Sequence, residues 1–123
     1  MRECYEYLKA AGIFFLATCE NTQPRVRPFS AVWLHGERLY LLIDKTEAVS
    51  LQLHANPRLE LCAMGEGSWL RLEAIAVEDD SREIRAAAPG DLLPEADSAE
   101  LWYLRKATAT FFSLTEPPRI KKI

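Results

Sequence analysis

The chain has 123 residues, 49% of them apolar, and a formal net charge of −3. This length fits a single domain over residues 1–123 with a hydrophobic core of its own. The charge balance gives little support to a nucleic-acid partner, because the one basic block is the short segment 119–122. No apolar run approaches membrane-spanning length, and residues 1–6 lack the apolar core of a secretory signal. We therefore expect a cytoplasmic protein without a membrane partner.

The cysteines and histidines give no metal-binding pattern. Cys4, Cys19 and Cys62 are widely spaced, and no CxxC pair occurs. Cys19 and Cys62 lie in apolar runs, where a thiol behaves as a small core residue. His35 and His54 have no second histidine or cysteine at ligand spacing, so no metal site is expected.

Periodicity and turn residues predict short helices separated by β-strands. Helices are expected over residues 2–11, 48–55 and 81–87, with Thr46 capping the second. In that second helix, Val49 with Leu53 and Leu51 with Ala55 are expected to form the buried face. Residues 89–98 read as irregular, and residues 100–105 as helical or a turn. The predicted strands cover residues 13–19, 25–34, 38–43, 59–64, 69–78 and 106–114.

These strands predict a mainly β protein. Most connections between them are short, which favours antiparallel pairing over parallel units with crossover helices. The turn at His35-Gly36-Glu37 predicts a hairpin, and Pro28 within a strand predicts an edge or bulge position. The economical architecture is a six-stranded antiparallel split β-barrel with a few short helices.

Two arginines mark the first candidate binding segment. Arg25 and Arg27 are two residues apart in a predicted strand, so both side chains project from one face, followed on that face by Phe29. Planar guanidinium groups match phosphate oxygens in pairs and keep their charge, so the segment suits a flat, anionic ligand. A solvated strand face without a specific ligand is the alternative.

Several short motifs then occur in a characteristic order along nearly the whole chain. They are Phe15-Leu16-Ala17-Thr18, residues 23–29, Gly36 with Leu39-Tyr40, Thr46 with Leu53 and Asn56-Pro57, Trp69-Leu70-Arg71-Leu72-Glu73, Asp79-Asp80 and Ala107-Thr108-Ala109-Thr110-Phe111. In order and spacing they resemble the small FMN-binding split-barrel proteins related to pyridoxamine 5′-phosphate oxidase.

The resemblance implies a homodimer with an FMN at the subunit interface. It implies that Arg27 is the main phosphate ligand with Arg25 as a weaker partner, that Ser30 and Thr46 donate hydroxyl groups, and that Lys45 adds charge. Trp102 is a candidate to stack on the flavin, with core or interface packing as its other role. The implied cofactor-binding residues are Arg25, Arg27, Pro28, Phe29, Ser30, Leu42, Ile43, Lys45, Thr46 and Trp102.

The chain departs from the family pattern at the start of the second helix. Many relatives carry a lysine where this chain has Glu47, and often a threonine where it has Ile43. If the Glu47 carboxylate points inward it repels a phosphate; if it points outward it supports the helix start.

Three functions are therefore open at this stage. The first is an FMN-dependent oxidoreductase acting on an unidentified small molecule, for which no catalytic residue is assigned. The second is a non-catalytic protein that binds a flavin, a heme or a deazaflavin. The third is a degenerate barrel without a cofactor, which serves as a dimeric structural module.

Overall fold

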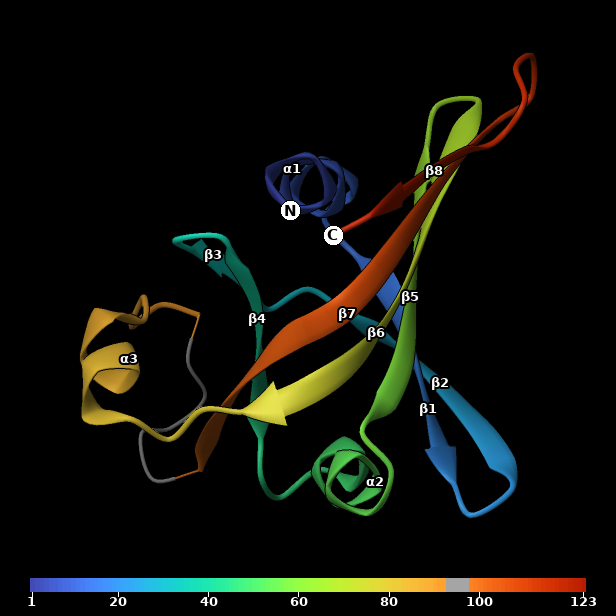
Figure 1. Ribbon diagram of the computed structural model, residues 1–123. Coiled ribbons are helices and arrows are strands. Elements are labelled where there is room, and N and C mark those ends of the chain that lie inside the picture. Colours follow the sequence, from blue (N-terminus) through green and yellow to red (C-terminus); the bar gives the residue numbers. More distant parts are fainter. Residues whose placement is uncertain (93–97) are drawn as a thin grey trace.

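The computed structural model describes residues 1–92 and 98–123, which form one curled antiparallel sheet with three short helices (Figure 1). The helices are α1 (Arg2–Ala11), α2 (Ala48–Ala55) and α3 (Arg82–Ala87). The strands are β1 (Phe14–Glu20), β2 (Gln23–Phe29), β3 (Val32–His35), β4 (Arg38–Asp44), β5 (Arg58–Gly65), β6 (Ser68–Glu78), β7 (Ala99–Ser113) and β8 (Arg119–Lys122).

The fold confirms the mainly β, antiparallel split barrel predicted from the sequence. Its strand order is β2-β1-β5-β6-β7-β4-β3, with β8 added on β7. The described residues form eight strands rather than six, because the predicted strand 25–34 is interrupted at Ser30 and the basic segment 119–122 also pairs. The break separates β2, which pairs with β1, from β3, which forms the expected hairpin with β4 around Gly36.

The largest departure concerns β7. Residues 100–105 were expected to be helical or a turn, but they extend the last strand, which begins at Ala99. Leu101, Trp102 and Leu104 are buried, and this part of β7 pairs with both β4 and β6. Tertiary pairing on both edges overrides the local pattern. The predicted irregular segment 89–98 lies partly outside the described residues.

The start of α2 also differs from expectation. The helix spans the predicted residues, but Glu47 rather than Thr46 is its N-cap. The Thr46 hydroxyl donates instead to Asp44 Oδ1, at 2.7 Å. Val49 and Leu53 are buried as predicted, whereas Leu51 is 74% exposed, so the second predicted pair faces solvent.

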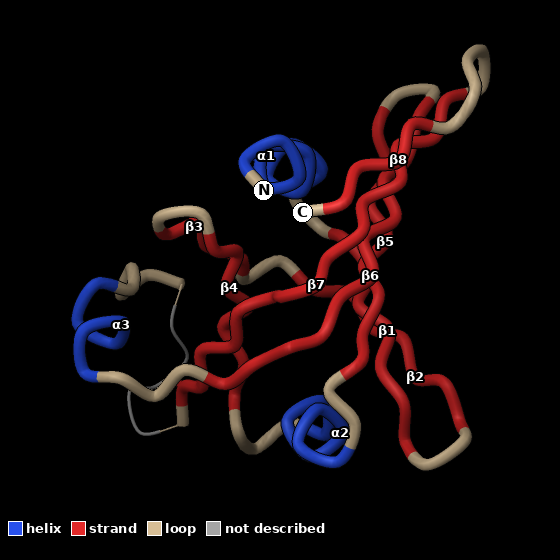
Figure 2. Tube along the Cα trace, in the orientation of Figure 1, coloured by secondary structure: helices blue, strands red, loops and turns tan. Residues whose placement is uncertain are grey.

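The alternation of strand side chains divides the sheet into two faces. Phe14, Leu16 and Thr18 of β1 point into the core, and Phe15, Ala17 and Cys19 point outward. Cys19 and Cys62 are accordingly half-buried on the outer face and are not the core residues predicted from their apolar surroundings. α1 packs on β5 and α2 on β1, both on the core side, and no described helix covers the other side of these strands (Figures 1 and 2).

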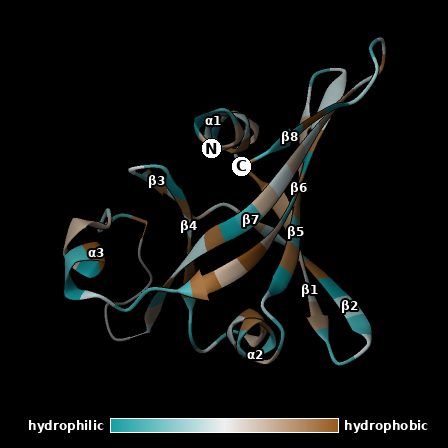
Figure 3. Ribbon diagram, viewed as in Figure 1, coloured by the Kyte–Doolittle hydropathy of each residue, from teal (hydrophilic) through white to brown (hydrophobic). Residues whose placement is uncertain are grey.

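Hydropathy follows this division. β2, at the edge of the sheet, is drawn largely hydrophilic, whereas the end of β6 is hydrophobic (Figure 3). No described helix has the length and apolarity needed to cross a membrane.

Leu51 and Leu53 of α2 allow a test of which side of the helix packs against the core. Leu53→Ala should lower the free energy of unfolding by about 2–5 kcal/mol, because it leaves a cavity in the core. Leu51→Ala, on the exposed side of the same helix, should change it by no more than about 0.5 kcal/mol. Urea denaturation at fixed protein concentration compares the two. Equal losses would contradict this placement of α2.

Candidate functional site

Arg27 lies at the centre of a polar cluster where β2, β1 and α2 meet. The pairing of β2 with β1 sets Arg27 opposite Leu16 and Arg25 opposite Thr18, so both arginines share a face as predicted. The half-buried Arg27 guanidinium donates from Nη1 to Thr18 Oγ1 at 2.7 Å and to the Leu16 carbonyl at 3.2 Å. Its Nη2 donates to Gln52 Oε1. These bonds hold the guanidinium in a defined place between the sheet and the helix.

Gln52 is a member of this cluster that sequence reasoning missed. It is 5% exposed, and its Oε1 also accepts a hydrogen bond from the Thr18 hydroxyl. The sequence did contain a signal, since Gln52 is a polar residue between Leu51 and Leu53 on a short apolar helix. An amide buried in such a helix requires hydrogen-bond partners from other elements. Gln52 therefore ties α2 to β1 and orients Arg27.

Arg27 retains hydrogen-bonding capacity for a ligand. Its three bonds to the described residues use three of the five N–H groups of a guanidinium. Burial lowers the pKa of Arg27, and the negative charge of Glu47 offsets part of this effect. The pKa of an arginine is so high that the side chain stays charged. The cluster thus presents a fixed positive charge to an anion.

Arg25 is placed less favourably. Its side chain is half exposed and forms an ion pair with Glu20, with Nη2 and Oε1 2.7 Å apart. The hydrogen bond from Arg25 is the main reason that the pKa of Glu20 lies below its ordinary value. Exposed ion pairs of this kind contribute little to stability. The Arg25 guanidinium already binds the Glu20 carboxylate, so it is less available to a phosphate.

The segment between β4 and α2 carries the other expected donors. Thr46 bonds through its backbone N–H and its hydroxyl to Asp44 Oδ1, and Lys45 is exposed. Glu47 makes no side-chain capping bond. Its negative charge opposes the lowering of the Arg27 pKa.

The remaining predicted residues are dispersed. Phe29 is half-buried and packs at a tilt on Phe14, whereas Pro28 and Ser30 are exposed on and after the edge strand. The other three have buried side chains, so only their backbone is available to a ligand without rearrangement. They are Leu42, Ile43 and Trp102. The Trp102 indole N–H donates to Glu100, as expected for its alternative, packing role.

A hollow of about 370 Å³ lies beside the polar cluster, between α2 and the turn after β1. Gln52 and Glu20 line it together with Asn21 and Leu51. A wider groove of about 590 Å³ runs along β1, β5 and β6, and Thr18, Arg58 and Lys106 are among its lining residues. The smaller hollow shares Gln52 with the polar cluster, so a ligand at Arg27 has space beside α2. The wider groove includes Ala17 and Cys19, which point to the outer face of the sheet.

Apolar side chains extend across the outer face of the sheet. One cross-strand row runs through Pro28, Phe15, Cys62, Arg71, Thr110 and Ile120. A neighbouring row contains Met64, Trp69 and Phe112, of which the last two rings stack at 4.8 Å with an interplanar angle of 9°. Phe15 is 45% exposed, Met64 61% and Ile120 66%. Apolar side chains gathered on one face are typical of an interaction surface.

The model of the pyridoxamine 5′-phosphate oxidase family matches residues 1–120. The chain belongs to this family. No curated protein sequence matches it. A solved NimC/NimA family protein from Clostridium acetobutylicum is 30% identical, with a TM-score of 0.88 over 100% of this chain and 92% of that one.

More distant structures share the fold. A pyridoxamine 5′-phosphate oxidase-related, FMN-binding protein from Nostoc punctiforme is 12% identical, with a TM-score of 0.63 over 99% of this chain and 94% of that one. A heme-binding protein from Mycobacterium smegmatis is 17% identical, with a TM-score of 0.72 over 94% of this chain and 55% of that one. Of these two proteins with the same fold, one is described as FMN-binding and the other as heme-binding.

The two arginines of β2 should differ in their contribution to stability. Arg27→Ala should lower the free energy of unfolding by about 1–3 kcal/mol, because buried Thr18 and Gln52 lose a partner. Arg25→Ala should change it by less than about 1 kcal/mol, because the pair with Glu20 is exposed. Urea denaturation of the protein without added ligand compares them. An equal or larger loss in Arg25→Ala would contradict the polar cluster.

Proposed function

We propose that this protein is a cytoplasmic FMN-binding flavoprotein, an oxidoreductase acting on a small molecule, with each flavin at a homodimer interface. The observation that carries the proposal is the half-buried Arg27, held by Thr18 and Gln52 with N–H groups left to donate. The family match and the FMN-binding relative of the same fold support it. A bound flavin would supply two-electron transfer to or from the substrate.

The residues present fit the phosphate end of FMN. Arg27 would bind the phosphate, and the exposed Lys45 and Ser30 offer an ammonium and a hydroxyl group on the flanking segments. The Thr46 hydroxyl already donates to Asp44 and would have to turn away from it to reach a phosphate. The start of α2 adds free backbone N–H groups and the positive end of its dipole. Ile43 adds no hydroxyl, because its side chain is a hydrocarbon, and that side chain is buried.

Glu47 weakens this site. Its negative charge favours the charged form of Arg27 and would repel a phosphate bound there. Two unit charges about 4 Å apart interact by a few kcal/mol at an effective dielectric constant near 20. We infer that the protein binds FMN less tightly than relatives with a lysine at this position.

Charge changes at Arg27 and Glu47 test the phosphate site. Arg27→Ala should weaken FMN binding by about tenfold to a hundredfold, because it removes a charge-assisted hydrogen bond. Glu47→Lys should tighten binding, because it replaces a repulsive charge by an attractive one, and Glu47→Gln should lie in between. Fluorescence titration of FMN measures all three, with Arg82→Ala on the exposed start of α3 as a charge-matched control.

An absorption spectrum of the purified protein separates the alternatives. Flavin bands support the proposal, and a Soret band would identify heme instead. A colourless protein that ignores added FMN would refute a flavin function and indicate a cofactor-free barrel. If FMN binds but neither Arg27→Ala nor Glu47→Lys alters its affinity, the phosphate lies elsewhere. Oxidation of a reduced nicotinamide by the loaded protein then distinguishes an enzyme from a carrier.

The outer face of the sheet fits a second copy of this chain. The row of Met64, Trp69 and Phe112 is apolar, and the neighbouring row contributes Phe15, Cys62 and Ile120 together with the polar Arg71 and Thr110. Thr18 and Cys19 line the groove beside this face, so a partner seated there would enclose the groove. A homodimer formed through this face would thus bury the groove between the two subunits.

A charge introduced on this face tests the dimer. The protein should have twice the 14.0-kDa chain mass in light scattering at micromolar concentration, and Phe15→Asp should give a monomer. Since the proposal puts the flavin at the dimer interface, Phe15→Asp should also lose FMN affinity. Leu51→Asp is the matched control, because it also replaces an exposed apolar side chain by a carboxylate, but on α2. This variant should remain dimeric. A wild-type monomer would refute the interface.

A further inference from the structure

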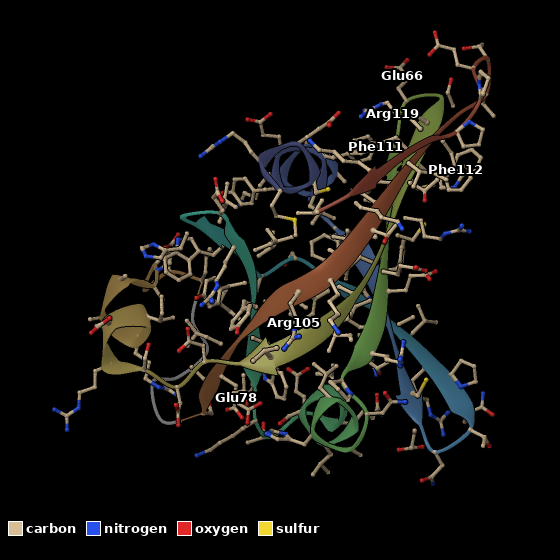
Figure 4. All side chains as sticks on the ribbon, in the orientation of Figure 1. Glu66, Glu78, Arg105, Phe111, Phe112 and Arg119 are labelled. Carbon is tan, nitrogen blue, oxygen red and sulfur yellow. The ribbon has the colours of Figure 1, made fainter. Side chains whose placement is uncertain are left out.

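We propose that His54, Glu78 and Glu100 form a binding site for a divalent transition-metal ion such as Zn²⁺. The three residues come from the last turn of α2, the end of β6 and the start of β7. One ligand atom from each lies within 4.8 Å of the others. Figure 4 shows Glu78 at the end of β6, directly beside α2.

Glu100 is a rigid ligand. The residue is 8% exposed, and its Oε1 accepts hydrogen bonds from the Ser50 hydroxyl at 2.7 Å and from the Trp102 indole N–H at 3.1 Å. These bonds direct the other oxygen, Oε2, toward His54, whose Nε2 is 3.9 Å away. Hydrogen bonds that orient a ligating carboxylate in this manner are usual around protein metal sites.

His54 has the arrangement of a metal-binding imidazole. Its Nδ1 is 2.7 Å from the Ser50 backbone carbonyl, which can only accept, so Nδ1 carries a proton. In the neutral ring Nε2 is then an acceptor, and it faces Glu78 Oε1 at 2.9 Å. A proton on Nε2 makes this contact a hydrogen-bonded ion pair. A metal ion bound between the two groups would take the place of that proton.

The ring is also fixed in orientation. The His54 imidazole packs edge-on against the Trp102 indole, with ring centroids 4.8 Å apart. Among residues 1–92 and 98–123, the charged groups in contact with His54 are the carboxylates of Glu78 from β6 and Glu100 from β7. A bound dication would therefore meet one imidazole nitrogen and two negative charges.

This donor set selects the kind of metal. One nitrogen and two carboxylate oxygens suit Zn²⁺, which binds such ligands at about 2.0–2.2 Å, whereas Ca²⁺ and Mg²⁺ prefer oxygen alone. His54 and Glu78 are partly exposed, so water can complete a four-coordinate site. The ion would displace a proton from His54 and join α2 to two strands, two residues from Gln52 of the polar cluster.

The proposal departs from the sequence-based expectation of no metal site and does not depend on flavin binding. The test uses the full-length protein after dialysis against EDTA, titrated with ZnCl₂ in a calorimeter. We expect one ion per chain and a higher melting temperature with Zn²⁺. His54→Ala and Glu78→Gln should each weaken binding by about tenfold or more, and His35→Ala, the other histidine, should have no effect.

Cobalt substitution identifies the ligands. Co²⁺ bound at this site should show d–d bands without the near-ultraviolet thiolate charge-transfer band that binding to Cys19 or Cys62 would produce. Zn²⁺ affinity unchanged in both His54→Ala and Glu78→Gln, a thiolate band, or no Zn²⁺ uptake by the wild type would each overturn the proposal. Glu78→Gln alters an exposed side chain, so it remains informative if His54→Ala does not fold.

Discussion

The pairing of β1 with β2 places Leu16 opposite Arg27, and the candidate site depends on this register. A shift by one residue would move every side chain of β2 to the other face of the sheet. Arg27 would then leave Thr18 and Gln52, and Val26 would lose its place on the outer face. The same register therefore places Arg25 and Arg27 on the inner face of β2, and Val26 and Pro28 on its outer face.

Positive and negative side chains lie close together near α2. Two arginines face this region, but Glu20 pairs with Arg25, and Glu47 acts on Arg27. One guanidinium thus remains to attract an anion, and its fixed hydrogen bonds reduce the conformational entropy lost on binding. The family fold is retained in this chain, and two carboxylates on the surrounding segments offset the charges of these arginines.

The short helix α2 connects several parts of this arrangement. Its buried side carries Val49 and Leu53 in the core and Gln52 in the polar cluster, while Ser50 orients Glu100. His54 ends the helix beside the carboxylates of β6 and β7. A helix of eight residues has little stability of its own, so these tertiary contacts hold it in place.

The sequence by itself determined the antiparallel class of the fold, the bounds of α2 and the shared face of Arg25 and Arg27, because periodicity and turn residues act locally. It could not determine that residues 100–105 continue β7, that Gln52 contacts Arg27, or that His54 meets Glu78 and Glu100. These features depend on which strands become neighbours. Contacts between residues separated by 24 to 50 positions are decided by sheet topology and burial, which no local pattern encodes.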